Sequence, residues 1–244
     1  MLLSIIVPAY NEEKTLEKTI KEFCDYLNRQ NYDYEIIIVN DGSRDRTLEL
    51  AQKIKTQFKN IVVINNPINQ GKGAAIRQGL LTARGQYRIF IDADNATSID
   101  HLEKVWPHFE NGCEIVIGSR NKKDALGACQ AVPQAIWKRL LGMAGNAIIQ
   151  LLAVPGIWDT QCGFKAFTEK SVTSIIPQTK INRWALDIEI LTLARLLNYK
   201  IAKIPVHWIN SPNSRVGIKG YFLTLKETFQ IKYNLLAGKY QSIE

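Results

Sequence analysis

Short apolar runs alternate with longer amphipathic runs along the first part of the chain. The apolar runs cover residues 3–8, 34–40, 61–65 and 87–92 and are rich in isoleucine and valine. Continuous apolar runs of this length are typical of strands that are covered on both faces, as in a parallel sheet. The pattern therefore predicts four parallel strands.

Amphipathic runs lie between these strands, at residues 12–28, 46–58 and 73–83. In the first of them Leu16 and Ile20 begin a series of apolar residues at the three-to-four spacing of a helix face. Strands that alternate with helices favour right-handed crossovers in a parallel sheet. We therefore predict an α/β fold with a Rossmann-like, doubly wound, mostly parallel sheet.

The later part of the chain is less regular. Residues 113–119 and 201–206 resemble further strands, and we expect mostly helix between them. Residues 138–152 combine many apolar side chains with basic Lys138 and Arg139, which fits either a core helix or a helix in a membrane interface. These segments predict helical elements on the C-terminal side of the sheet.

The composition is that of a globular protein. The chain has 244 residues, 46% hydrophobic and 22% charged, and no linker or repeat divides it, so we expect one domain over residues 1–244. Its four cysteines lack C-x-x-C spacing, which favours reduced thiols in a cytosolic setting. A signal peptide is not expected, because the residues after Met1 lack the basic start, long apolar stretch and small-residue cleavage site of one. A membrane-spanning helix is not expected either, because the longest apolar stretch, residues 144–157, is interrupted and short of the ~20 residues needed.

The net charge of +8 indicates an anionic partner. Nucleic acid, a membrane surface and a phosphorylated substrate would all satisfy it. Because the sequence contains no recognisable nucleic-acid-binding module, we do not expect nucleic acid to be the partner.

Polar residues follow the predicted strands, at residues 10–13, 40–43, 65–66 and 92–94. In doubly wound sheets ligands bind at the carboxyl ends of the strands, so these positions are the candidates for a site. The alternative is that such residues cap the following helices.

Two carboxylates, Asp92 and Asp94, stand one residue apart after the fourth strand, where side-chain alternation directs both to the same side. Like charges so placed raise one pKa or require a cation, and oxygen ligands suit Mg²⁺ or Mn²⁺ bridged to phosphates. The pair alone is a weak signal, since surface loops also contain it by chance.

Residues 69–73 precede a predicted helix and include Lys72. Backbone N–H groups at a helix N-terminus attract anions, so this segment is a candidate phosphate site, or only a tight turn. The P-loop spacing and the dinucleotide-binding glycine pattern are both absent, which removes the main support for ATPase and dehydrogenase readings.

Several of these motifs together resemble family 2 inverting glycosyltransferases with the GT-A fold. The motifs are Pro8-Ala9-Tyr10-Asn11-Glu12, residues 39–47, Asn69-x-Gly71-Lys72-Gly73, Asp92-Ala93-Asp94 and Gly118-Ser119-Arg120. They occur in the family's order. Residues 159–165 and 183–189 further resemble the polyprenyl-phosphate sugar transferases, especially dolichyl-phosphate β-glucosyltransferases.

The resemblance implies transfer of a hexose, with inversion, from a nucleotide sugar such as UDP-glucose to a polyprenyl phosphate. Residues 1–120 would form the nucleotide-sugar half and residues 121–244 the acceptor half. The implied donor-binding residues are Pro8, Tyr10, Glu12, Asp41, Lys72, Asp92, Ala93, Asp94, Arg215 and Lys219, with Asp92 and Asp94 as metal ligands.

Two alternatives concern the substrates. One is a soluble or polysaccharide acceptor. The other is GDP-mannose as the donor, which is weakened because mannose synthases that resemble this chain usually have Gln where it has Ala96. A catalytically silent relative would be expected to lose one of the paired aspartates, and this chain keeps both.

The candidate catalytic residues are Asp94, Asp159, Arg120 and Asp187. Arg120 corresponds to a basic residue near the donor or acceptor phosphate in the family, and Arg215 and Lys219 to a loop that folds over the diphosphate. A phosphate acceptor is largely ionised near neutral pH, so we expect Asp159 to orient Arg120, Lys165 or the phosphate rather than to remove a proton. Asp187 and Glu189 fit either a base or an internal ion pair.

A lipid acceptor without a membrane-spanning helix requires peripheral contact with the membrane, at its cytoplasmic face. Residues 140–157, flanked by Trp137 and Trp158, offer an apolar surface, and residues 221–240 with their lysines are a second candidate.

Overall fold

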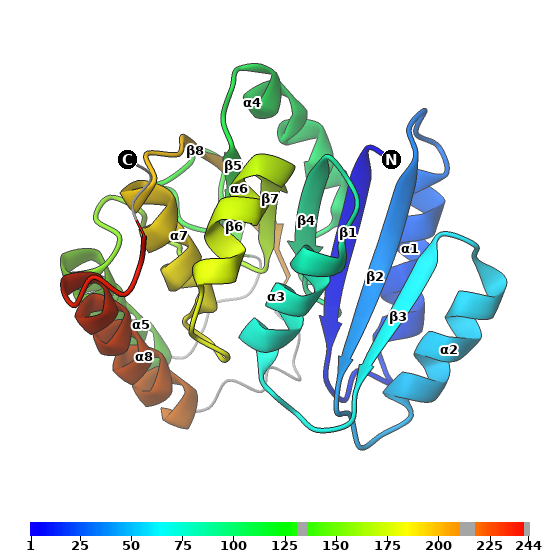
Figure 1. Cartoon of the computed structure of the whole chain (residues 1–244), viewed down its shortest axis with the longest axis horizontal. Helices are drawn as coiled ribbons and strands as arrows, with labels where there is room; N and C mark the ends of the chain where they lie inside the picture. Colours follow the sequence, from blue (N-terminus) through cyan, green and yellow to red (C-terminus); the bar gives the residue numbers. More distant parts are fainter. Residues whose placement is uncertain (131–135, 210–217, 242–244) are drawn as a thin grey trace.

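The computed structural model describes residues 1–130, 136–209 and 218–241 (Figure 1). A seven-stranded sheet has the order β3-β2-β1-β4-β7-β5-β8. Its strands are β1 (Leu3–Ala9), β2 (Tyr34–Asp41), β3 (Ile61–Asn66), β4 (Tyr87–Ile91), β5 (Ile115–Ser119), β7 (Phe164–Thr168) and β8 (Ile201–Pro205). All neighbouring pairs are parallel except the two that involve β7. The predicted mostly parallel α/β sheet is confirmed.

Helices cover both faces of this sheet (Figure 1). The α-helices are α1 (Leu16–Leu27), α2 (Thr47–Gln57), α3 (Lys72–Thr82), α4 (Trp106–Glu110), α5 (Ile136–Leu152), α6 (Glu169–Ile175), α7 (Leu186–Leu196) and α8 (Ile218–Leu236), with 3₁₀ turns η1 (Ile99–Lys104) and η2 (Ile176–Gln178). Helices α1, α2 and α4 contribute to the core on one face, and α3, α6 and α7 to the core on the other.

The core is two clusters separated by the sheet. Along β1, Ile5 and Val7 belong to one cluster and Ile6 to the other, because successive strand side chains point to opposite faces. All three side chains are fully buried. This double burial explains why the strands are continuous apolar runs in the sequence.

Strand β7 is the main departure from the sequence prediction. It lies between β4 and β5 and is antiparallel to both, in a region where mostly helix was expected. That expectation was wrong for β7 because Lys165 interrupts its apolar run, although the structure buries Lys165 completely. A small second sheet of β6 (Cys129–Gln130) and β9 (His207–Trp208) was also missed, since two-residue strands leave no periodic signal.

The chain reverses its direction across the sheet between β1 and β4. From β1 it adds β2 and β3 on one side and then β4 on the other. Such a reversal leaves a crevice at the carboxyl ends of the strands, which is where open α/β sheets bind ligands. In Figure 1 these ends point toward the lower edge.

Helices α5 and α8 lie side by side at one end of the sheet (Figure 1). In the described part of the chain, no helix combines the length and apolar character needed to cross a bilayer.

Candidate active site

The loops after β1 and β2 are joined by hydrogen bonds. Asn11 has a left-handed backbone (φ 55°), its N–H donates to Ser43 Oγ at 2.9 Å, and its side chain accepts from the N–H of Arg44 at 2.7 Å. The N–H of Glu12 donates to Thr47 Oγ1 at 2.7 Å. The segment that contains the predicted Pro8, Tyr10 and Glu12 is therefore fixed against the loop after β2.

Asp41, at the end of β2, is buried and organises the turn before α3. Its carboxylate accepts from Asn69 Nδ2, Gln70 N and Gly71 N, each at 2.8 Å. A carboxylate has about four acceptor sites, so three are used within the protein. Asp41 thus links the second strand end to the 69–73 turn.

This turn places Lys72 at the start of α3. Gly71 has φ 106°, and a Cβ on it would lie 2.5 Å from the carbonyl oxygen of Asn182. The Lys72 ammonium lies 2.6 Å from Asp92 Oδ1. Burial lowers the pKa of Lys72, but the charges of Asp92 and Asp187 outweigh it and leave the pKa raised, so Lys72 is a cation here.

Asp92 is held from its other side by Gly163. The Asp92 N–H donates to the Gly163 carbonyl at 3.2 Å, and a Cβ on Gly163 would collide with the Asp92 carboxylate, first with Oδ2. Ala93 is buried, and its carbonyl accepts from Thr19 Oγ1. The backbone around the first aspartate is therefore fixed.

Asp94 is partly buried and accepts from the Ala96 N–H at 3.0 Å. Burial, followed by the negative charge of Asp92, raises the pKa of Asp94. Two neighbouring carboxylates that repel each other form a donor set that fits a divalent metal ion. Among the described residues no third carboxylate, histidine or cysteine joins them, so the remaining ligands would come from substrate or water.

Arg120 and Asp159 form a bidentate pair. Arg120 donates to the Asp159 carboxylate from Nε at 2.8 Å, from Nη2 at 2.7 Å and from its own backbone N–H at 2.7 Å. Burial raises the pKa of Asp159, but the Arg120 charge outweighs it and the pKa is lowered. Asp159 therefore orients Arg120, whose guanidinium also lies 5.3 Å from the ring centre of Trp208.

The negative charge of Asp92 also acts on the Arg120 guanidinium. Burial lowers the pKa of Arg120, but Asp159 raises it most and Asp92 adds to this, so the net pKa is raised. The structure thus brings a cation from the end of β5 within electrostatic reach of the end of β4.

Asp124 is a residue that the sequence reasoning missed. Its side chain is fully buried and accepts from the N–H groups of Trp158 at 2.9 Å and Asp159 at 2.8 Å, from Ser119 Oγ at 3.0 Å and from Lys203 Nζ at 3.0 Å. It fixes the backbone that carries Asp159. No local motif could have revealed it, because its partners lie up to 79 positions away.

Asp187 and Glu189 belong to internal networks. Asp187 accepts from the fully buried Lys165 Nζ at 2.5 Å, and Lys165 also donates to the Cys162 carbonyl at 2.7 Å. Glu189 is fully buried and accepts from two backbone N–H groups and from Tyr240 Oη at 2.6 Å. The ion-pair interpretation therefore describes Asp187, whereas Glu189 binds neutral donors.

Two further predicted donor-binding residues are Lys219 and Arg215. Lys219 is exposed in the first turn of α8. Arg215 lies outside the described residues.

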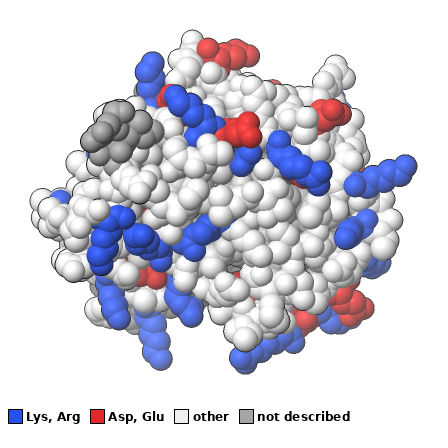
Figure 2. All heavy atoms as spheres, viewed as in Figure 1, with Lys and Arg blue, Asp and Glu red and all other residues white. Residues whose placement is uncertain are grey.

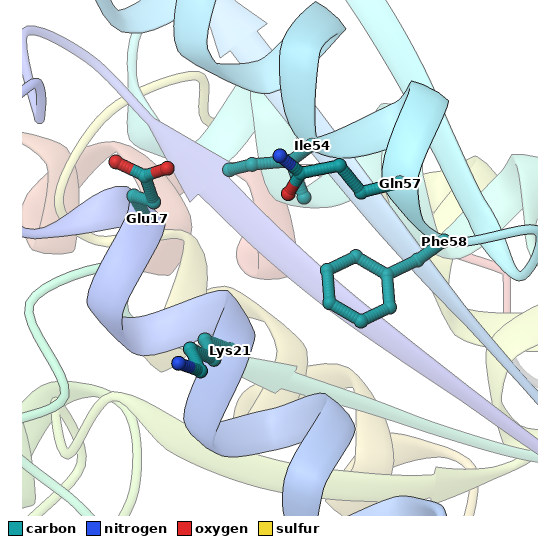
Figure 3. A pocket seen from close by; sticks show the side chains of 5 residues that line it. All are labelled: Glu17, Lys21, Ile54, Gln57 and Phe58. Atoms are coloured by element: carbon teal, nitrogen blue, oxygen red, sulfur yellow. The ribbon is translucent and has the colours of Figure 1, made fainter.

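A pocket of about 280 Å³ lies elsewhere, between α1 and α2 (Figure 3). It is lined by Glu17, Lys21, Ile54, Gln57 and Phe58. None of these is a predicted site residue.

One known protein family matches most of the chain. The family described as "Glycosyl transferase family 2" matches residues 4–172. The chain belongs to glycosyltransferase family 2. It is an enzyme of the glycosyltransferase class, and the resemblance stated from its motifs is confirmed.

Curated relatives extend this family-2 match over most of the chain. This chain is 39% identical to a dolichyl-phosphate beta-glucosyltransferase of Trichomonas vaginalis, in an alignment that covers 89% of this chain and 69% of the relative. It is 35% identical to the human dolichyl-phosphate beta-glucosyltransferase over 98% of this chain and 77% of that one.

Solved structures support the GT-A fold of this glycosyltransferase. Glucosyl-3-phosphoglycerate synthase from Mycobacterium tuberculosis, solved with Mn²⁺, UDP and phosphoglyceric acid, superimposes with a TM-score of 0.69. The match covers 100% of this chain and 80% of that one at 20% identity.

Proposed function

We propose that this glycosyltransferase transfers glucose from UDP-glucose, with inversion, to the phosphate of a polyprenyl lipid of the dolichyl type. Both curated relatives named above are dolichyl-phosphate beta-glucosyltransferases, and this chain aligns with most of each. The observation that carries the proposal is the Arg120–Asp159 pair within electrostatic reach of Asp92, which gives one site a donor side and an anion-binding side.

On the donor side, Pro8, Tyr10, Glu12 and Asp41 would line the nucleoside pocket. Lys72 at the N-terminus of α3 would contact the diphosphate, supported by the anion preference of helix N-termini. Ala93 is buried in the core between the aspartates, so its part would be to space them along the chain. Lys219, in the first turn of α8, would approach the diphosphate, and Arg215 is proposed with it from the sequence alone.

Asp92 and Asp94 would hold the divalent ion, Mg²⁺ or Mn²⁺. When bound, such an ion neutralises the negative charge that grows on the leaving diphosphate. The negative charge of Asp92 raises the pKa of Asp94, as expected of neighbouring carboxylates that a cation would bridge, and this supports the assignment. The glucosyl-3-phosphoglycerate synthase with a similar fold was solved with Mn²⁺ and UDP.

On the acceptor side, in residues 121–244 with Arg120 at their edge, the lipid phosphate would bind Arg120. Asp159 accepts hydrogen bonds from Nε and Nη2 of Arg120, which fixes the orientation of the guanidinium. The remaining N–H groups of Arg120 would bind the phosphate. A phosphate near neutral pH is already an effective nucleophile. Asp187 is bound to Lys165 and nearly buried, so we do not assign it a proton-transfer step.

Contact with a membrane would be made by α8 and α5. Exposed apolar side chains recur along α8 at helical spacing, at Phe222, Phe229, Tyr233 and Leu236, and Met143 and Leu151 are exposed on α5. Lys226 and Lys239 are exposed near them. Figure 2 shows basic side chains gathered at the lower left, where Figure 1 has α8. An apolar face with surrounding lysines suits an anionic leaflet.

We assign this contact to the cytoplasmic face. All four cysteines are free, which agrees with a reducing compartment.

The test is transfer of labelled sugar to polyprenyl phosphate by the purified protein. UDP-glucose and GDP-mannose are compared, each with Mg²⁺, with Mn²⁺ and with EDTA. We expect chelator-sensitive labelling of the lipid from UDP-glucose. Donor hydrolysis without lipid labelling would move the acceptor to another class of molecule, and preferential labelling from GDP-mannose would overturn the choice of sugar.

A further inference from the structure

The Lys72 ammonium lies against the carboxylate that is proposed to bind the metal ion. Its Nζ is 2.6 Å from Asp92 Oδ1, and the two side chains are 24% and 32% exposed. A metal ion on Asp92 and an ammonium at this distance would repel each other and would use the same carboxylate. Lys72 and the metal ion therefore compete for Asp92.

The Asp92 carboxylate has little room to turn away from Lys72. A Cβ on Gly163 would collide with Oδ2 and would lie 2.9 Å from Oδ1, so Oδ2 is the oxygen nearer to Gly163. The Asp92 N–H donates to the Gly163 carbonyl, which keeps this backbone in place. Oδ1 is the oxygen that Lys72 contacts.

The backbone of Lys72 is fixed, but its side chain has freedom to move. Gly71 and Gly73 on either side are pressed against the backbone of Asn182, and the N–H of Ala74 donates to the Asn182 carbonyl at 2.9 Å. The Lys72 side chain is partly exposed. A diphosphate at the N-terminus of α3 would attract this ammonium and release Asp92 Oδ1.

We propose that Lys72 is a built-in counter-ion that keeps the affinity for free metal ions low until a nucleoside diphosphate arrives. The Lys72 ammonium then leaves Asp92 and contacts the diphosphate, so that the metal ion and the diphosphate bind cooperatively. This inference rests on the proposed donor and metal sites, and it assigns Lys72 a role before the donor binds.

Binding of Mn²⁺ to the purified protein tests this, with free Mn²⁺ measured by electron paramagnetic resonance with and without UDP. The wild type is expected to bind Mn²⁺ weakly alone and tightly with UDP. Lys72→Met is expected to bind Mn²⁺ alone about tenfold more tightly than the wild type, a change that corresponds to ~1.4 kcal/mol. UDP should then improve Mn²⁺ binding by a smaller factor.

Two control variants separate competition from general effects. Lys72→Arg keeps the positive charge and should bind Mn²⁺ alone as the wild type does. Lys53→Met removes an exposed ion pair with Glu17 (3.1 Å) between α1 and α2 and should leave Mn²⁺ binding unchanged. Thermal unfolding of each variant establishes that it is folded.

The outcomes distinguish this inference from the proposed function. If the wild type binds Mn²⁺ with UDP but Lys72→Met binds free Mn²⁺ no more tightly than the wild type, the competition is refuted and the proposed metal site stands. If the wild type binds no Mn²⁺ even with UDP, both the metal site and the competition are refuted.

Discussion

Gly163 shows how closely single residues are fitted around Asp92. It lies in van der Waals contact with the carboxylate, and its carbonyl accepts from the Asp92 N–H. Any side chain at this position has to displace Asp92. The glycine is therefore required by the position of a functional side chain rather than by a turn.

We expect Gly163→Ala to lower transferase activity by about 100-fold, since displacement of a metal-binding group by about 1 Å has effects of that size. UDP-dependent Mn²⁺ binding should weaken in parallel. Gly142→Ala is the matched control, because a Cβ there meets nothing within 4 Å. Equal activity of the two variants would contradict the role given to Gly163.

Asp94 gives a prediction with a defined pH dependence. Its pKa in the folded protein is raised by burial and by Asp92, so the ionised carboxylate destabilises the metal-free fold. This penalty is absent below the unfolded pKa, near pH 4, and develops as pH rises through the folded pKa. Asp94→Asn should therefore unfold at a higher temperature than the wild type at pH 7, without metal, and lose that advantage near pH 4.

The same Asp94→Asn substitution should reduce transfer by at least about 100-fold, because one ligand of the metal ion is lost. Calorimetry across the pH range, with chelator present, is the measurement for stability. A variant less stable than the wild type at pH 7 would show that the carboxylate repulsion is not the dominant effect.

The sequence revealed these aspartates because they follow apolar strands and form short motifs. It could not reveal Gly163 or Asp124, whose partners are brought close only by the fold. The Arg120–Asp159 contact joins residues 39 positions apart. Hydrophobic periodicity gives no sign of such a contact, and both residues were candidates only because of the family resemblance.

At the scale of elements, the 119–125 turn after β5 supports the 158–159 segment before β7. Asp124 links them by accepting from the backbone of Trp158 and Asp159, and Lys203 on β8 neutralises its charge. The Arg120–Asp159 pair therefore depends on a contact between two loops.

Replacing Asp124 by Ala should loosen the acceptor side while the donor side is retained. We expect the KM for polyprenyl phosphate to rise by up to about 30-fold, since the two lost bonds to N–H groups are together worth about 2 kcal/mol, and the affinity for UDP to stay unchanged. Steady-state kinetics and UDP titration measure the two effects. Equal losses on both sides would indicate general destabilisation instead.

Element prediction succeeded where apolar runs are continuous and failed where a polar residue is buried in a strand. Strands β1 to β4 were visible as apolar runs, whereas β7 was hidden by Lys165, which only the ion pair with Asp187 allows inside the core. The 3.6-residue period identified α1 but could not decide whether exposed apolar residues on α8 face a membrane.

At the scale of the whole molecule, α8 and α5 present an apolar face at one end of the sheet. The charge of +8 adds attraction to anionic headgroups. This face is the one that we propose to contact the membrane that carries the lipid acceptor.

We expect the double substitution Phe222→Ser and Phe229→Ser to reduce cosedimentation with anionic vesicles by about tenfold or more, because each exposed aromatic would bury its area in the interface. Leu81→Ser, at an exposed leucine on α3, is the control. Unchanged vesicle binding by the double variant would exclude α8 as the contact.

The most direct test of the central claim is the structure of the product. The purified protein is supplied with UDP-glucose, a short polyprenyl phosphate and a divalent metal ion, and the product is characterised by nuclear magnetic resonance. The account predicts a β-linked glucosyl phosphate on the lipid together with free UDP. An α-linked product, or free glucose with unmodified lipid, would contradict it.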